Sequence, residues 1–330
     1  MGNFMIITTI NPVTPAIRLF ETHVDWNLIL VGDKKSPPIA DTERLTFLSL
    51  ETQLGLGMKL GAASPVNHSA RKNIGYLHAI GRGAQVIYDT DDDNIPYAHW
   101  TPPVQFRCET LAGSPSGFVN IYRHFTDEHI WPRGFPLDEI LDARLTYKMD
   151  CPVEIGVWQS LADADPDVDA IWRLTLNKDI TFRRNKPVGI AAGHYCPFNS
   201  QNTFWKREVF PLLYLPTTVR FRFTDILRGY IAQRLMRENA LYLGFMAASV
   251  RQERNPHDYL DDFRDETDCY LQIKPIVRLL DSLALSGDYH KDLRTTYRAL
   301  CQQGFVAAHE LSTLEAWLND LVSISVHNHG

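Results

Sequence analysis

The acidic run Asp89-Thr90-Asp91-Asp92-Asp93-Asn94 is the stretch of this chain best suited to chemistry, and it directly follows a short apolar run ending at Tyr88. Two unit charges about 4 Å apart near a protein surface interact by about 4 kcal/mol, so crowded carboxylates need either water or a cation. A hard divalent cation is often held by one or two carboxylates and completes its shell with water and substrate phosphates. The run therefore predicts a metal–diphosphate site for Mn²⁺ or Mg²⁺, with Asp93 as a ligand and Asp91 contacting the metal ion, through water, or the ribose.

The acidic runs of this chain also have simpler interpretations. A solvated turn or helix cap is the alternative for residues 89–94. A calcium loop is disfavoured, because counting Asp89 as its first position puts Asn94 where glycine is needed and Trp100 where glutamate is needed. The second acidic run, over residues 163–169, is interpreted as a loop that contacts the ligand or as a solvated surface.

The elements that would position the acidic run alternate between strand and helix over the first hundred residues. Apolar runs predict strands over residues 4–10, 27–31, 46–50 and 85–88, and helical spacing predicts helices over 14–21 and 67–81, the second capped by Asn67 or Ser69. Such alternation favours an α/β fold with a mostly parallel, Rossmann-type sheet flanked by helices. Ligands of these sheets bind beyond the carboxyl ends of the strands, where Asp33 and the acidic run both fall.

The rest of the chain divides into an irregular middle and a helical end. Residues 95–219 are rich in proline and aromatic residues, with short strands predicted over 117–122, 171–176 and 188–192. Apolar residues recur at helical spacing from Thr224 onward. We therefore expect a nucleotide-binding catalytic domain over residues 1–240, and a helical C-terminal segment over 241–330 packed on it.

Composition limits the class of protein. The 330 residues are 45% hydrophobic, enough for a large core, and the net charge of −6 with no basic run argues against a nucleic-acid partner. Five widely spaced cysteines without a CxxC pair indicate reduced thiols and a cytoplasmic location. We find neither a signal peptide nor an apolar stretch of roughly 18 residues that would span a membrane, so any membrane contact would be peripheral.

Several polar residues are candidates for binding a nucleotide. Asp33 follows a buried strand and Gly32, and its carboxylate is suited to accept a hydrogen bond from the imide N–H of uracil. Thr8 and Thr9, at the end of the first strand, are expected to contact the same nucleoside. An Asx turn is the alternative role for Asp33.

Two further groups are candidates for the acceptor side. Asp225 opens a predicted helix, where aspartate is often the N-cap. The alternative roles are a base that deprotonates an acceptor hydroxyl and an acceptor-binding residue. The polar residues after Pro197 carry the donors and acceptors that sugar hydroxyls need, with turn chemistry as the alternative. These residues are Asn199, Ser200, Asn202 and Thr203.

Seven short motifs follow one another in an order that resembles the STELLO glycosyltransferase family. They lie at residues 8–10, 30–35, 70–76, 89–94, 163–171, 199–203 and 225–230. The resemblance covers roughly residues 5–240. A more distant similarity is to the plant UDP-arabinopyranose mutases, which also place three aspartates after a strand.

The resemblance implies a GT-A-like fold, a nucleotide-sugar donor and a divalent metal at a DxD site. It implies that Arg71 and Asn73 line the nucleotide pocket, where a helix start also favours anions, although an exposed helix face is the alternative. It further suggests His257 as a metal ligand, with a surface-loop histidine as the alternative, and Asp225 as the base of an inverting enzyme. Asp92 and Arg254 are expected to bind the nucleotide, and Arg228 a sugar.

The predicted function is transfer of a sugar from a UDP-sugar to a glycan or other hydroxyl acceptor, in polysaccharide or other glycan synthesis. The metal ion would neutralise the departing diphosphate as a Lewis acid. A nucleotide-sugar mutase and a non-catalytic partner protein with the same fold remain alternatives. A nucleotidyltransferase is disfavoured because no glycine-rich phosphate loop lies near the N-terminus.

Overall fold

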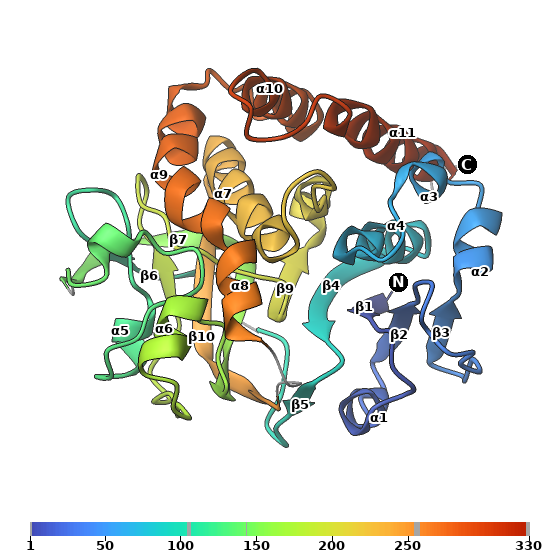
Figure 1. Cartoon of the computed structure of the whole chain (residues 1–330), viewed down its shortest axis with the longest axis horizontal. Helices are drawn as coiled ribbons and strands as arrows, with labels where there is room; N and C mark the ends of the chain where they lie inside the picture. The colour runs from blue at the N-terminus through green and yellow to red at the C-terminus, as the bar shows by residue number, and fades with distance from the viewer. Residues whose placement is uncertain (1, 104–106, 143, 254–257, 328–330) are drawn as a thin grey trace.

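The structure is a computed structural model that describes residues 2–103, 107–142, 144–253 and 258–327, without the side chains of residues 148–151 and 327. A ten-stranded sheet runs through the molecule and helices cover it (Figure 1). The first four strands along the sheet are mutually parallel. From the edge inward they are β3 (Leu45–Leu48), β2 (Trp26–Val31), β1 (Gly2–Thr8) and β4 (Ala84–Asp91).

The helices of this N-terminal part connect the parallel strands. They are α1 (Pro15–Glu21), α2 (Leu50–Gly55), α3 (Lys59–Ala63), the 3₁₀ turn η1 (Ser69–Arg71) and α4 (Lys72–Gly81). A Cβ on Gly75 would lie 2.5 Å from the side chain of Val31 and 2.8 Å from that of Ile6, so glycine allows α4 to pack closely on the sheet. The predicted strands and helices of this region are confirmed. The predicted caps are wrong, because His68 Nδ1 accepts the first free N–H, that of Ala70.

The remainder of the sheet is mixed, so the prediction of a mostly parallel sheet is wrong beyond β4. Antiparallel pairings join β4 to β9 and β9 to β7, whereas β7 and β10 are parallel. The strands are β5 (Asn94–Pro96), β6 (Arg107–Ala112), β7 (Thr146–Ala164), β8 (Val188–Ile190), β9 (Asn202–Lys206) and β10 (Leu241–Gln252). Irregular segments and short helices connect most of these strands, and a longer helix over Thr224–Met236 lies in the connection to β10, the parallel neighbour of β7.

Two predicted strands of the middle region are wrong, whereas the one over 188–192 is confirmed as β8. Residues 117–122 make a single bridge from Phe118 to Tyr195 and lead into α5 (Tyr122–Phe125). Residues 171–176 lie in α6 (Ala170–Thr175), because Asp169 caps this helix by accepting the N–H of Trp172 at 2.9 Å. The capping carboxylate outweighs the strand preference of the apolar residues.

The C-terminal helical segment begins later than predicted. Residues 241–252 form β10, where a Cβ on Gly244 would lie 2.5 Å from the ring of Trp158 in β7. Helices follow from Tyr259. They are α8 (Tyr259–Asp265), α9 (Thr267–Ser282), α10 (Tyr289–Gln302) and α11 (Glu310–His327), and α7 (Thr224–Met236) precedes β10. The remaining 3₁₀ turns are η2 (Leu137–Glu139), η3 (Arg207–Leu213), η4 (Phe221–Phe223) and η5 (Arg237–Asn239).

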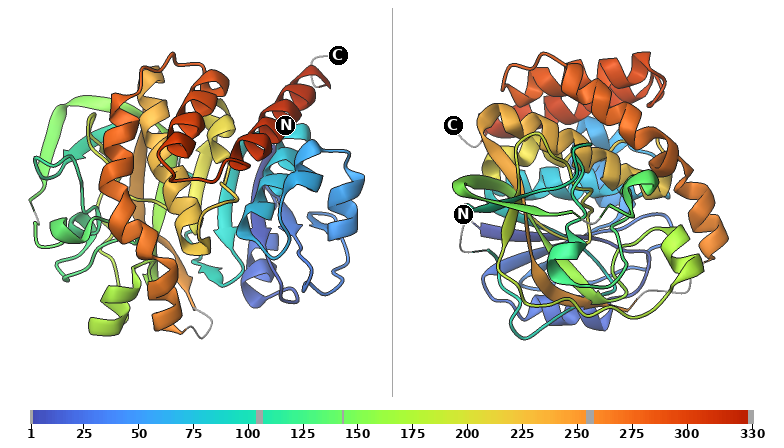
Figure 2. Two further views of the ribbon diagram at one scale, coloured as in Figure 1. Left: turned by 45° about the horizontal axis from the view of Figure 1, so that its top comes forward. Right: turned by 90° about the vertical axis from the view of Figure 1, so that its left-hand side faces the viewer.

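The last helix returns to the beginning of the chain. Figures 1 and 2 show α11 lying along α3 and α4. The carboxylate of Asp320 accepts the free N–H groups of Lys59 (3.0 Å) and Leu60 (2.9 Å) at the start of α3. The C-terminal segment is thereby fastened to the strands and helices of the first hundred residues.

Side chains of the central strands alternate between two buried clusters, one on each face of the sheet. In β1, Phe4 and Ile6 belong to the cluster under α4, α7 and the C-terminal helices, and Met5 and Ile7 to the cluster under α1. The cysteines whose side chains are described, Cys108, Cys196, Cys269 and Cys301, are unpaired. Within the described residues, every helix is too short or too polar to cross a bilayer.

Candidate functional site

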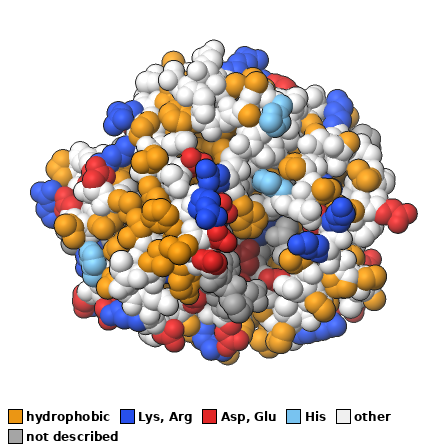
Figure 3. Space-filling model, in the orientation of Figure 1, with side chains coloured by type: hydrophobic (Ala, Val, Ile, Leu, Met, Phe, Trp, Pro, Cys, Tyr) orange, Lys and Arg blue, Asp and Glu red, His pale blue; other side chains and the backbone are white. Residues whose placement is uncertain are grey.

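A cavity of about 550 Å³ opens at the carboxyl ends of β1, β2 and β4, within the range of small-molecule sites. Figure 3 shows this hollow, with acidic side chains inside it. The cavity collects ten of the predicted site residues. They are Thr8, Thr9, Asp33, Arg71, Asp91, Asp92, Asp93, Asn199, Ser200 and Asp225.

Asp91, the last residue of β4, lies beside Thr8 in the parallel register of β1 and β4. Desolvation raises the pKa of the Asp91 carboxyl to about 7. Lys72 opposes this rise, whereas the charges of Asp93, Asp89 and Asp92 add to it. Asp91 is therefore a carboxyl group that a nearby cation would stabilise in its charged form.

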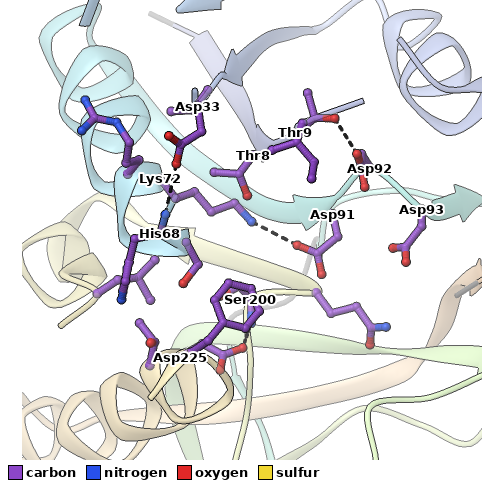
Figure 4. Close-up of a pocket in the computed structure, with 18 of the residues that line it drawn as sticks. Thr8, Thr9, Asp33, His68, Lys72, Asp91, Asp92, Asp93, Ser200 and Asp225 are labelled. Carbon is purple, nitrogen blue, oxygen red and sulfur yellow. Dashed lines mark hydrogen bonds and ion pairs between the residues drawn. The ribbon is translucent and has the colours of Figure 1, made fainter. Parts of the chain in front are cut away.

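Asp92 holds the acidic turn in place. Its Oδ2 accepts hydrogen bonds from the hydroxyl of Thr9 and from Asn11 Nδ2 (3.0 Å), and its carbonyl accepts one from Thr14 Oγ1 (2.6 Å). Asp93 is fixed from the other side, since its Oδ2 accepts from Gln252 Nε2 at the end of β10 (3.1 Å). The turn is thus braced between β1 and β10, and Figure 4 shows Asp91 and Asp93 side by side facing the cavity.

Lys72 is a site residue that the sequence interpretation missed. Its buried ammonium donates to the carbonyl of Thr90 (2.7 Å) and lies 2.6 Å from Asp89 Oδ1 and 3.4 Å from Asp91 Oδ1. Burial alone would lower the pKa of Lys72, but the two carboxylates raise it above its usual value. Lys72 stands between Arg71 and Asn73, the two residues expected to line the nucleotide pocket, and this place beside Arg71 is the signal that points to it.

Arg71 lines the cavity but also braces its wall. Its Nε donates to Gln53 Oε1 (2.7 Å) and its Nη1 to the carbonyl of Ser64 (3.1 Å). Gln53 in turn donates to the carbonyls of Gly32 and Leu48, at the ends of β2 and β3. Within the described residues, Nη2 of Arg71 is buried and has no hydrogen-bond partner.

Asp33 joins two loops at the opposite end of the cavity from the acidic turn. Its Oδ1 accepts from the backbone N–H of Lys34 (2.6 Å) and of Asn67 (2.9 Å), and its Oδ2 accepts from the backbone N–H of His68 (3.1 Å). Figure 4 shows Asp33 and His68 on one side of the cavity and Asp91 and Asp93 on the other.

Asn73 and Arg228 do not line the cavity, in contrast to their predicted roles. Asn73 exchanges two 2.8 Å hydrogen bonds with the backbone of Leu215. Arg228 is fully buried, with Nη1 3.0 Å from Asp89 Oδ2 and Nη2 3.1 Å from the hydroxyl of Ser200. Both residues support the walls of the cavity from behind.

Asn202 and Thr203 were predicted to bind a sugar, but both are completely buried in β9 and neither lines the cavity. Asn202 Nδ2 donates to the carbonyl of Leu161 (2.9 Å), and Thr203 Oγ1 donates to the carbonyl of Asn199 (2.8 Å). Asn199 and Ser200, which precede the strand, are the members of this motif that reach the cavity.

Arg133 organises the wall that carries Asp225, and no sequence motif points to it. Both terminal nitrogens of Arg133 donate to Asp225 at 3.1–3.2 Å, and its Nε donates to Asp167 at 2.9 and 3.1 Å. Asp225 also accepts the backbone N–H groups of Ser200 (3.1 Å) and Ile226 (3.0 Å). Asp225 is the second residue of α7, after Thr224, so it is not the N-cap of this helix, which was one of the three roles left open for it.

The predicted metal ligand His257 and the predicted phosphate ligand Arg254 lie outside the described residues. Within the described part of the chain, no three His, Cys, Asp or Glu side chains converge as a complete metal cage. Two carboxylates at the edge of a cavity match sites in which substrate phosphates and water supply the other ligands. The oxygen donors of Asp91 and Asp93 fit a hard divalent cation of this kind.

Comparison with known proteins finds similarity to proteins named as probable glycosyltransferases. Residues 222–328 match the family model of the STELLO glycosyltransferases. Two proteins of Arabidopsis thaliana, "Probable glycosyltransferase STELLO1" and "Probable glycosyltransferase STELLO2", are each 28% identical over 326 residues. The matches cover 91% of this chain but 41% and 42% of those proteins, so the chain spans about two fifths of their length. The resemblance to the STELLO glycosyltransferase family is confirmed.

Proposed function

We propose that this protein is a metal-dependent glycosyltransferase of the GT-A type, which transfers a sugar from a UDP-sugar to a hydroxyl group of a glycan. One observation carries the proposal. A single cavity has Asp33 at one end and Asp91 and Asp93 at the other, all at the carboxyl ends of neighbouring parallel strands. This arrangement suits a nucleotide whose base and diphosphate bind at opposite ends of the site.

Asp91 and Asp93 would hold Mn²⁺ or Mg²⁺ together with the diphosphate of the donor. When bound, the ion neutralises the charge that develops on the departing nucleoside diphosphate. Lys72 keeps Asp91 oriented by its 3.4 Å contact, and Asp92 keeps the turn fixed through Thr9 and Asn11. The chain itself thus provides a rigid frame for one edge of the ion's coordination shell.

Asp225 stands on the opposite wall, where an acceptor hydroxyl would approach. A carboxylate has about four lone-pair sites, and Arg133, Ser200 and Ile226 already supply five hydrogen-bond contacts to this one. To act as a base, Asp225 would exchange one of these donors for the acceptor hydroxyl. In this proposal Asp225 takes the proton of the acceptor hydroxyl, whose oxygen bonds to the anomeric carbon as the bond from that carbon to UDP breaks, so the anomeric configuration inverts.

Calorimetric titration of the protein with UDP, with and without Mn²⁺, tests the proposal. We expect binding that depends on Mn²⁺ and is lost in Asp93→Asn. Asp179→Asn is the matched control, because Asp179 is exposed and lies outside the cavity. Equal UDP binding by Asp93→Asn, or no effect of the metal, would remove the support for a metal–diphosphate site.

A further inference from the structure

We propose that His68 is a specificity-determining residue, which donates a hydrogen bond from Nε2 to a carbonyl of the donor's uracil while Asp33 accepts the imide N–H. This inference rests on the proposed function, since it assigns the base-binding end of the same cavity. It concerns a residue that neither the motifs nor the matched family segment singles out.

The hydrogen bonds of His68 fix which ring nitrogen carries the proton. Nδ1 accepts the backbone N–H of Ala70 at 3.0 Å, so Nδ1 is unprotonated. In a neutral imidazole the other nitrogen then carries the proton. Burial lowers the pKa of His68 below its ordinary value of 6.5, although the charges of Glu310 and Asp33 partly oppose this effect. The lowered pKa keeps the ring neutral at pH 7. His68 therefore presents Nε2–H as a donor.

This donor is held in place at the edge of the cavity. The backbone N–H of His68 donates to Asp33 Oδ2 at 3.1 Å, so the two residues are fixed relative to each other. His68 is half-buried and lines the cavity, and Figure 4 shows it on the same side of the cavity as Asp33. Across the described chain, no acceptor within hydrogen-bond distance of Nε2 is found, which leaves this N–H for a ligand.

Asp33 supplies the complementary acceptor. Its Oδ1 already accepts two N–H groups, from Lys34 and Asn67, and its Oδ2 accepts one, from His68. A carboxylate oxygen has room for about two donors, so Oδ2 retains one acceptor position. Asp33 and His68, joined by this backbone hydrogen bond, thus offer one acceptor and one donor, the two kinds of group that the imide edge of uracil needs, in which N3–H lies between two carbonyl groups.

Asparagine is the informative replacement for His68. Its Oδ1 can still cap the N–H of Ala70, as asparagine does at helix starts, but it lacks the Nε2 donor. His309→Asn is the matched control, since His309 is exposed and outside the cavity. Thermal unfolding of both variants checks that the fold is kept.

The test is a titration of wild-type protein and His68→Asn with UDP, 2-thio-UDP and 4-thio-UDP, in Mn²⁺. Sulfur accepts hydrogen bonds poorly, so we expect wild-type protein to bind one of the thio analogues roughly three- to tenfold more weakly than UDP. His68→Asn should bind UDP weaker by a similar factor and no longer distinguish that analogue. Undiminished UDP binding by His68→Asn, or unchanged discrimination, would overturn the role of His68. Absence of any UDP binding by wild-type protein would instead overturn the proposed function.

Discussion

Arg133 donates from both terminal nitrogens to the carboxylate of Asp225, with contacts of 3.1–3.2 Å, while its Nε holds Asp167. Burial alone would lower the pKa of Arg133, but Asp167 and Asp225 raise it well above its usual value. A single guanidinium therefore fixes two acidic residues on one wall of the cavity, and the stability of that wall depends on it.

Replacing Arg133 with methionine should lower the free energy of unfolding by about 3 kcal/mol, because it leaves two largely buried carboxylates without their cation. Urea denaturation measures the change. Arg183→Met is the control, since Arg183 pairs with the exposed Asp127 and should cost less than about 1 kcal/mol. Equal losses in the two variants would contradict a structural role for the Arg133 cluster.

Replacing Asp225 with asparagine should reduce sugar transfer by at least about 100-fold, the usual range for loss of a general base. The affinity for UDP should change little, because Asp225 is on the wall opposite the acidic turn. Transfer rates and UDP titrations separate the two effects. Full transfer activity in Asp225→Asn would exclude Asp225 as the base and leave it a purely structural partner of Arg133.

Binding of Mn²⁺ with UDP should depend on pH through Asp91, whose pKa is raised to about 7. A proton on Asp91 competes with the metal ion, so affinity should rise with pH up to about 7 and then level off. In the absence of metal, the contribution of Asp91 to the stability of the protein has the opposite pH dependence and falls as the pH rises. The raised pKa stabilises the native state below 3.8, the ordinary value, and this contribution is lost as the pH rises through about 7. In titrations from pH 5.5 to 8.5 the pH dependence should be shallower in Asp91→Asn than in wild-type protein if Asp91 is the titrating ligand, because the UDP phosphate, with a second pKa of about 6, then titrates without it. An unchanged slope would assign the titration to another group.

Replacing Lys72 with methionine removes the cation that opposes the pKa rise of Asp91. We therefore expect the midpoint of the pH profile for Mn²⁺–UDP binding to move to higher pH in Lys72→Met. The same titration series measures it. A midpoint that moves down or stays fixed would show that the 3.4 Å contact does not govern the charge of Asp91.

One edge of the site is predictable from the sequence because a simple rule applies there. Parallel strands bring their carboxyl ends together, so the strand pattern alone is enough to place Thr8, Asp33 and Asp91 in one region. The same rule does not say which way a side chain points within a motif. Asn73 therefore could not be distinguished from its neighbour Lys72, although the first bonds to Leu215 and the second reaches Asp91.

The second half of the molecule is harder to predict for two physical reasons. A short apolar run such as residues 241–250 suits a buried strand or a buried helix equally well, and only pairing with β7 decides for the strand. Arg133 lies far from Asp225 in the sequence, in a segment with no periodic pattern, and long-range ion pairs of this kind have no local signature. The roles predicted for Asn202 and Thr203 are wrong because nothing local shows that β9 is buried on both faces.

The most direct test of the metal–diphosphate site is a crystal of this protein grown with Mn²⁺ and UDP, with anomalous diffraction used to locate the metal. We expect an anomalous peak between the carboxylates of Asp91 and Asp93 and the two phosphates, with uracil at the Asp33 end of the cavity. Bound UDP without manganese at these two aspartates, or manganese held elsewhere, would contradict the account.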